Sequence, residues 1–246
     1  MTGTRWSAMR RGPGGWGGLA LALMLSACGG GGGEPATEPP QVTPGRWVLL
    51  GSSTALGAGA TGRQGWAQQL AAELPALGAS LSNLAVGGST TYAARPSGDL
   101  PPAGRAAPDP AGNVDAALAL APRLLLLAYP GNDTALGLSA DETVANLGRV
   151  RAHAQARGVA VLVLGTQPRQ LSEAGLARLA EIDRRLARLA GECFVELRSG
   201  LAGPDGRLAV DRDAGDGVHP NDAGHALILA RVRARLRSGR CVRLGP

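Results

Sequence analysis

Short apolar runs alternate with longer amphipathic segments along most of the chain. Residues 124–128, LLLLA, are apolar throughout, and residues 159–166, VAVLVLGT, form a second run of this kind. Apolar runs without polar alternation are typical of strands that are covered on both faces of a sheet. On this basis we expect strands at residues 46–51, 79–88, 124–128, 159–166 and 193–197.

Helical patterns fill the intervals between these runs. Apolar residues recur at spacings of three and four over residues 172–190 and mark one face of a helix. Ser139 and Glu142 form a capping box, which predicts a second helix that begins there and ends near Arg157. Further helices are expected at residues 65–74, 113–121 and 221–237, and a long Pro/Gly-rich loop at residues 93–112.

Strands that alternate with helices predict an α/β protein. Because continuous apolar strands need cover on both faces, the fold expected is a three-layer α/β/α domain around a mainly parallel, five-stranded sheet. Ligands of such sheets bind beyond the carboxyl ends of the strands. The residues that follow each predicted strand are therefore the first place to look for chemistry.

The N-terminal segment has the pattern of an export signal. Residues 1–27 join a basic stretch to the apolar LALMLSA, which is too short to span a bilayer. Leu25 to Cys28 resembles the bacterial lipobox, and that resemblance implies cleavage before Cys28 and a lipid anchor on its sulfur. With Gly29 after the cysteine, the sorting rule favours the outer membrane, facing the periplasm. The alternative is a plain signal peptide with a chance cysteine.

The Gly/Pro-rich residues 28–45 are expected to form a tether, and the domain to span residues 46–246. An exported protein meets an oxidising compartment, so the remaining cysteines, Cys193 and Cys241, are expected to form a disulfide; two unpaired thiols are the alternative.

The charge balance and the histidine content argue against nucleic-acid binding and metal binding. The 25 basic residues are all arginine, against 19 acidic ones, and removal of residues 1–27 leaves a net charge of +3. This balance does not favour a nucleic-acid partner. The three histidines are scattered and lack metal-ligand spacing, so metal binding is disfavoured.

Side chains suited to acyl transfer follow the predicted strands. A serine nucleophile needs a neighbouring base, which His219 can supply, and Asp216 can fix the tautomer of its ring. Backbone N–H groups beside Gly88 and the side-chain amide of Asn132 can stabilise an oxyanion. These residues lie in four segments, GSSTALGAG (51–59), NLAVGG (83–88), GND (131–133) and DGVHPNDAGH (216–225).

The four segments, in this order, resemble the blocks of the SGNH hydrolase (GDSL esterase/lipase) family. The resemblance covers about residues 46–238 and favours Ser53 over Ser52 as nucleophile, because Gly57 then falls at the family's glycine. Ser52 stands where the family usually has aspartate. The family implies a flavodoxin-like sheet, no cofactor, and the following site: a triad of Ser53, His219 and Asp216, and an oxyanion hole of the Ser53 N–H, the Gly88 N–H and the Asn132 side chain.

The function expected is that of a serine esterase in the cell envelope. Short acyl esters, acetyl esters on carbohydrate above all, are the expected substrates. The alternatives within the family are a lysophospholipase or a thioesterase. The alternative that is not an enzyme is a catalytically inactive, envelope-binding lipoprotein. Ser52, which stands in place of the family's aspartate, is the observation that suggests it.

Overall fold

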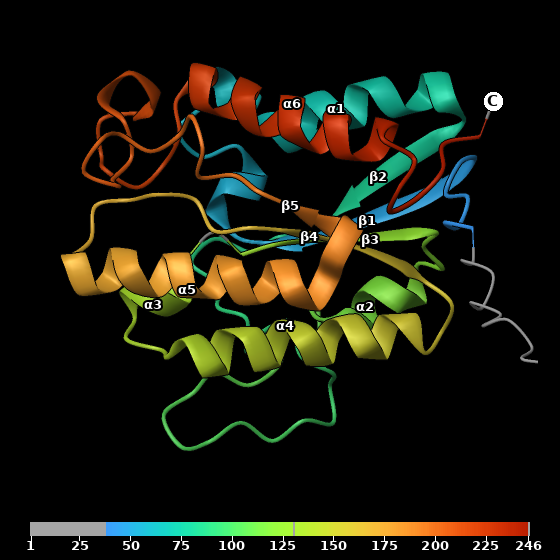
Figure 1. Ribbon diagram of the computed structural model, residues 1–246. Helices are drawn as coiled ribbons and strands as arrows, with labels where there is room; N and C mark the ends of the chain where they lie inside the picture. Colours follow the sequence, from blue (N-terminus) through green and yellow to red (C-terminus); the bar gives the residue numbers. More distant parts are fainter. Residues whose placement is uncertain (1–37, 130, 246) are drawn as a thin grey trace, which may run out of the picture. The chain divides into compact units, whose positions relative to one another are not determined.

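Five parallel strands form the centre of the protein (Figure 1). The computed structural model describes residues 38–129 and 131–245. In sheet order the strands are β2 (Ala79–Asn83), β1 (Gly45–Gly51), β3 (Leu124–Ala128), β4 (Ala160–Leu164) and β5 (Phe194–Val195). From β1 the chain adds β2 on one side, and it then adds β3, β4 and β5 in turn on the other side. This makes a doubly wound, flavodoxin-like sheet, whose topological switch point lies between β1 and β3. The predicted fold class is confirmed.

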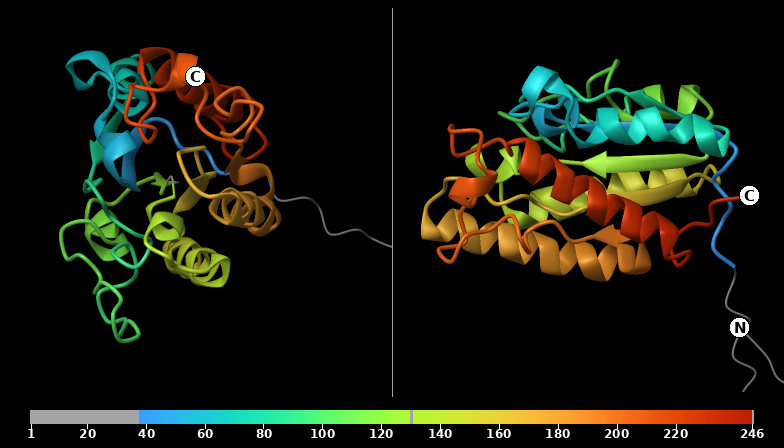
Figure 2. Two further views of the ribbon diagram at one scale, coloured as in Figure 1. Left: turned by 90° about the vertical axis from the view of Figure 1, so that its left-hand side faces the viewer. Right: turned by 90° about the horizontal axis from the view of Figure 1, so that it is seen from above.

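Helices cover both faces of the sheet and complete the three layers (Figures 1 and 2). One face carries α1 (Trp66–Glu73) and α6 (Asp222–Arg237). The other carries α2 (Val114–Ala119), α3 (Asn132–Ala135), α4 (Ala140–Gln155) and α5 (Glu173–Ala190). Within the described residues, no helix is both long and apolar enough to cross a membrane.

Successive side chains of the central strands enter two different cores. Leu124 and Leu126 of β3 pack towards α1 and α6, whereas Leu125 and Leu127 pack towards α4 and α5, and all four are fully buried. Because neighbouring residues of a strand point to opposite faces, a strand between two helical layers needs apolar residues at every position. This is why β3 appears in the sequence as an unbroken apolar run.

The second predicted strand is longer than the observed one. Strand β2 ends at Asn83, but the Val86 N–H still donates to the Gly51 C=O at 3.1 Å. The chain therefore continues beside the end of β1 before it turns away at Gly88, whose φ is +79°. This path places Gly88 at the carboxyl edge of the sheet, next to the end of β1.

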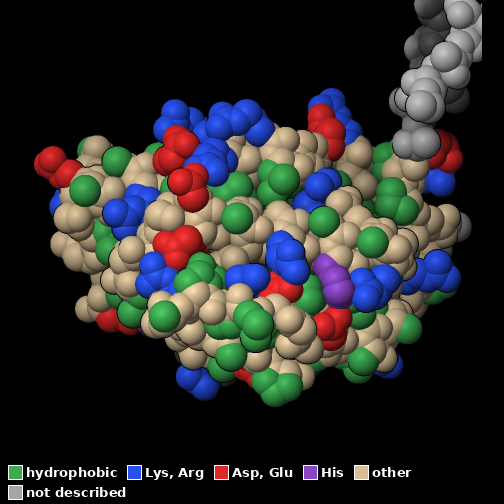
Figure 3. Space-filling view, turned by 90° about the horizontal axis from the view of Figure 1, so that it is seen from below, with side chains coloured by type: hydrophobic (Ala, Val, Ile, Leu, Met, Phe, Trp, Pro, Cys, Tyr) green, Lys and Arg blue, Asp and Glu red, His purple; other side chains and the backbone are tan. Residues whose placement is uncertain are grey.

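The Pro/Gly-rich segment 93–112 lies against the outer side of α4. Arg105 pairs with Glu142 at 2.6 Å, and Asp99 pairs with Arg149 of the same helix. Basic and acidic side chains are interspersed over this face of the molecule (Figure 3). These two ion pairs hold the long loop against α4.

The two ends of the described chain meet at the amino edge of the sheet. Val42 is buried, and its C=O accepts from the Trp47 side chain at 2.9 Å. The backbones of Gln41 and Arg243 form an isolated parallel β-bridge. Packed residues therefore precede the predicted domain start at residue 46. In the structure a disulfide joins Cys193 and Cys241, the pairing expected from the sequence. The predicted signal peptide, Cys28 and residues 28–37 of the tether lie outside the described residues, and the lipid anchor stays a prediction.

Candidate active site

Ser53 stands directly beyond the carboxyl end of β1. It opens a single 3₁₀ turn, η1 (Ser53–Leu56), and its side chain is partly exposed, whereas Ser52 is fully buried. Gly57 ends the turn with φ +81°, and a Cβ there would lie 2.2 Å from the Arg63 C=O. The glycine four residues after Ser53 is therefore required by the backbone of the turn that presents the hydroxyl.

A hydrogen-bonded series links Ser53 to a histidine and a carboxylate. The Ser53 Oγ lies 2.8 Å from Nε2 of His219, and Nδ1 of His219 lies 2.6 Å from Oδ2 of Asp216. The carboxylate can only accept, so Nδ1 carries the proton and Nε2 is left to accept from the serine hydroxyl. The structure thus brings together the three residues that the sequence assigned to one reaction, from segments 166 positions apart.

The carboxylate of Asp216 stays ionised in spite of its surroundings. Burial alone raises its pKa, but hydrogen bonds from the His219 ring and from the His219 and Val218 N–H groups outweigh burial and lower the pKa to about 2. The two backbone bonds go to Oδ1, which leaves Oδ2 for the ring. The loop therefore aims one carboxylate oxygen at His219 and uses the other to hold itself in shape.

The segment after the Ser53 turn contacts the loop that carries His219 (residues 213–221, the histidine loop) at Gly59. A Cβ at this position would lie 2.2 Å from the Pro220 C=O and 2.9 Å from the His219 Cβ. Only a residue without a side chain permits this approach. The close contact keeps His219 within hydrogen-bond reach of Ser53.

The expected oxyanion donors lie at the same edge of the sheet. The N–H groups of Ser53 and Gly88 donate to no other group in the described part of the chain. Asn132 is the first residue of α3, the next element after β3, and its Nδ2 donates to the Ser89 C=O at 3.0 Å. This bond ties Asn132 to the loop that carries Gly88.

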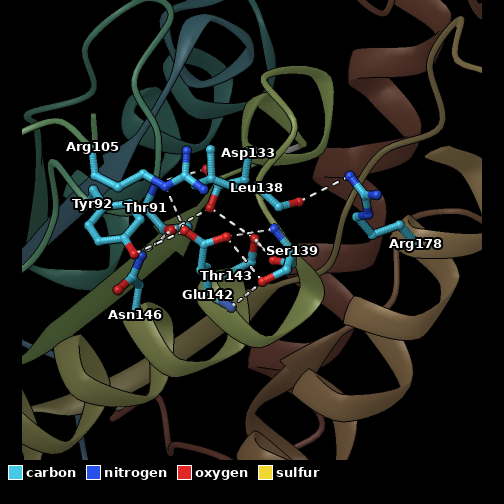
Figure 4. Close-up of polar contacts among 10 residues, drawn as sticks. All are labelled: Thr91, Tyr92, Arg105, Asp133, Leu138, Ser139, Glu142, Thr143, Asn146 and Arg178. Carbon is cyan, nitrogen blue, oxygen red and sulfur yellow. Dashed lines mark hydrogen bonds and ion pairs between the residues drawn. The ribbon is translucent and has the colours of Figure 1, made fainter. Parts of the chain in front are cut away.

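Asp133, beside Asn132, has a structural position. It is buried and accepts from the Thr91 N–H at 2.9 Å, from the Thr91 hydroxyl, and from the Thr143 hydroxyl at 2.9 Å (Figure 4). Burial raises its pKa, although these bonds act in the opposite direction. Asp133 thus fastens the loop after Gly88 and the start of α4 to α3, and it does not face Ser53.

The loop between β4 and α5 contributes contacts to the site that were not expected from the sequence. Gln167 donates from Nε2 to the Val218 C=O at 2.7 Å, next to His219, and the Gln170 N–H donates to the Gly217 C=O at 2.6 Å. Their position after a predicted strand was the one signal that pointed to them, since no motif marks them. This loop, residues 165–171, braces the histidine loop.

Asp183 of α5 anchors the brace. Its carboxylate accepts from the Thr166 N–H at 2.7 Å and from the Thr166 hydroxyl at 2.9 Å. Burial raises the pKa of Asp183 to about 6, although these bonds lower it in part. The anchor is therefore a buried carboxyl group that titrates within the working range of many enzymes.

This shift of the Asp183 pKa predicts that the difference in stability between the wild type and Asp183→Asn depends on pH. The pKa of Asp183 in the folded protein, about 6, exceeds the value in the unfolded chain. The contribution of Asp183 to the free energy of unfolding is therefore largest below about pH 4 and smallest above pH 6. As the pH rises through this window, we expect the wild type to lose about 2 to 3 kcal/mol relative to Asp183→Asn. Denaturant titrations of both proteins at several pH values measure this difference. A constant difference would contradict the buried titration.

The described residues contain no group of three or more His, Cys, Asp or Glu side chains placed to hold a metal ion. His225, which follows the last motif, is fully buried; its Nδ1 accepts from the Trp66 N–H at 3.2 Å and its Nε2 donates to the Ala58 C=O at 2.9 Å. Burial lowers its pKa. His225 is thus a neutral core residue that ties α6 to α1.

A serine, a histidine and an aspartate joined by hydrogen bonds at the carboxyl edge of a doubly wound sheet are characteristic of hydrolases that act on acyl groups. The chain belongs to the GDSL-like lipase/acylhydrolase family, whose model matches residues 49–227. The family expected from the four sequence segments is thereby confirmed.

Solved structures share the fold at low sequence identity. The structure named TesA is 23% identical with a TM-score of 0.59, and the match covers 79% of this chain and 99% of that one. The esterase EstA from Pseudoalteromonas sp. is 16% identical with a TM-score of 0.56, over 78% and 97% of the two chains. The acetyl xylan esterase AlAXEase is 16% identical with a TM-score of 0.56, over 77% and 98%. No curated protein matches the sequence.

Proposed function

We propose that this protein is a serine esterase that hydrolyses carboxylic esters, with Ser53 as the nucleophile. The observation that carries the proposal is the hydrogen-bonded series from Ser53 through His219 to Asp216, with distances of 2.8 Å and 2.6 Å. A serine hydroxyl becomes an effective nucleophile when a positioned base accepts its proton. Membership of an acylhydrolase family supports the same chemistry.

The first half of the reaction transfers the acyl group to the enzyme. The Ser53 Oγ attacks the ester carbonyl carbon while its proton passes to Nε2 of His219. The carbonyl oxygen becomes an oxyanion, which accepts hydrogen bonds from the Ser53 N–H, the Gly88 N–H and the Asn132 side chain. The tetrahedral intermediate then breaks its bond to the alcohol oxygen, and His219 returns the proton to the departing alcohol.

The second half releases the acid. Water loses a proton to Nε2 of His219 and attacks the acyl-enzyme carbonyl. The resulting intermediate breaks its bond to Ser53, which regains the proton from His219. Throughout both halves, the ionised Asp216 holds the ring in one tautomer and stabilises the imidazolium that forms twice per turnover.

The proposed substrates carry short acyl groups, with acetyl esters of carbohydrates first. Support comes from the acetyl xylan esterase of similar fold and from the low aromatic content of the chain, 3%. Esters with longer acyl chains, such as lysophospholipids and acyl thioesters, are the second candidate. Two exposed apolar residues favour this candidate: Val86, two positions before Gly88, and Leu136, at the end of the α3 helix that Asn132 begins.

The proposed function is tested by labelling with a fluorophosphonate, which reacts with activated serines, followed by peptide mapping. We expect one adduct, on Ser53, that protects the protein from a second label. A parallel series of 4-nitrophenyl esters, from acetate to palmitate, is expected to show the highest kcat/KM for the short chains. Preference for palmitate would favour the second candidate. A folded protein that forms no adduct would instead support the inactive, envelope-binding alternative.

A further inference from the structure

Arg169 is a partly buried cation beside the proposed oxyanion hole. Its Nη1 donates to Oδ1 of Asn132 at 3.0 Å, and within the described ranges no carboxylate lies close enough to form an ion pair with it, although the charge of Asp216 raises its pKa. Its Nε is buried and has no hydrogen-bond partner in those ranges. Burial lowers the pKa of Arg169, and the negative charge of Asp216, with which Arg169 forms no hydrogen bond, opposes this only in part. The position of Arg169 therefore calls for a functional explanation.

The side-chain amide of Asn132 is held from both ends. Its oxygen accepts from Arg169, and its Nδ2 donates one of two hydrogens to the Ser89 C=O. A flipped amide would set its NH₂ group against the Arg169 N–H and its oxygen against the Ser89 C=O, and both contacts would be repulsive. The pair of bonds thus fixes a single orientation, in which one N–H of Asn132 remains free.

The loop that carries Arg169 is itself fixed. Asp183 holds Thr166 at its start, and the Gln170 N–H bonds to the Gly217 C=O at its end. The guanidinium is therefore presented by the same brace that supports the histidine loop. Its contact with Asn132 joins the oxyanion side of the site to the base side.

We infer that Arg169 is a positioning residue of the oxyanion hole: it holds the Asn132 amide so that its free N–H meets the developing oxyanion. This inference rests on the proposed esterase function. The positive charge at Oδ1 also polarises the amide and strengthens the N–H as a donor. Because the oxyanion exists only after attack, the contact acts on kcat rather than on the binding of substrate.

The test is a double-mutant cycle on Arg169 and Asn132 in the full-length protein. We expect Asn132→Ala to lower kcat by about 10²- to 10³-fold, as loss of one oxyanion donor does. Arg169→Gln is expected to lower kcat by about 10- to 100-fold with little change in KM. The double variant should be no slower than Asn132→Ala alone, because Arg169 acts through that amide.

Two further variants separate positioning from general damage. Arg169→Lys keeps a donor and is expected to recover part of the activity lost in Arg169→Gln, and added guanidinium should do the same for Arg169→Ala. Arg178→Gln is the matched control, since Arg178 donates from α5 to the Leu138 C=O at 3.1 Å and does not contact Asn132. Its activity should equal that of the wild type.

The outcomes distinguish this inference from the function beneath it. An inactive wild type overturns the esterase proposal and the inference together. An active wild type with a normal Arg169→Gln overturns the inference alone. Losses that multiply in the double variant would show that Arg169 acts independently of Asn132, and a loss confined to KM would show that it contributes to the binding of substrate; either result would also overturn the inference.

Discussion

Ser53→Ala is expected to lower kcat for a short-chain ester by about 10⁶-fold, the scale found when the nucleophile of a serine protease triad is removed. The loss is large because no acyl-enzyme can form without the hydroxyl, and in the described part of the chain Ser53, at 2.8 Å, is the one serine that hydrogen-bonds to the His219 ring. Steady-state kinetics with 4-nitrophenyl acetate measure the effect. Thermal unfolding of the same sample shows whether the fold is kept.

Ser52→Ala provides the matched control, because it makes the same chemical change one position earlier. Ser52 is fully buried, and its Oγ has no hydrogen-bond partner in the described part of the chain. Removal of an unpaired hydroxyl changes little, so we expect nearly wild-type activity. If Ser52→Ala abolished activity and Ser53→Ala did not, the assignment of the nucleophile would be wrong.

Asp216→Asn is expected to lower kcat by about 10⁴-fold, as the same change does in a serine protease triad. The structure explains why the substitution is not conservative here. The Val218 and His219 N–H groups both donate to Oδ1, so the oxygen of the new amide is held at that position. Its NH₂ group then faces Nδ1 of His219, which must accept. The ring is forced into the tautomer whose Nε2 carries a proton, and it cannot take one from Ser53.

Asp213→Asn is the control for Asp216→Asn, since Asp213 lies in the same loop. Asp213 accepts from the Gly215 and Gly217 N–H groups at 3.0 Å and does not contact His219. An amide oxygen can accept the same bonds, so activity should remain close to that of the wild type. Comparison of the two variants in stopped-flow acylation experiments isolates the effect of the tautomer. Equal losses would point to a loop that has merely been disturbed.

Much of the fold could be predicted because its signals are local. Residues 124–128 form β3 as predicted, since a strand buried on both faces has no position for a polar side chain. The capping box at Ser139 is present in both of its halves and begins α4. The short helix α3 was not predicted, because its four residues carry no periodic pattern and follow Gly131 with φ +129°.

The nucleophile, base and acid could be proposed from the sequence because four segments, in this order, resemble the blocks of the SGNH hydrolase family; a serine in a Gly-rich turn by itself is more often structural. The sequence did not predict Arg169, Gln167 or Asp183. Their partners lie 37, 51 and 17 positions away, and their side chains look like ordinary loop and helix residues in the sequence.

The sequence by itself determined the order of the strands and of the longer helices and the edge of the sheet at which the candidate residues meet, because periodicity marks these elements and parallel strands end at one edge. The resemblance of four segments to a known family then indicated which residues at that edge are expected to react. Only the tertiary structure decided which side chains hold the reacting groups in place. The contacts of Arg169 with Asn132 and of Gln167 with the histidine loop arise when separate loops pack together, and no local pattern of residues specifies such packing.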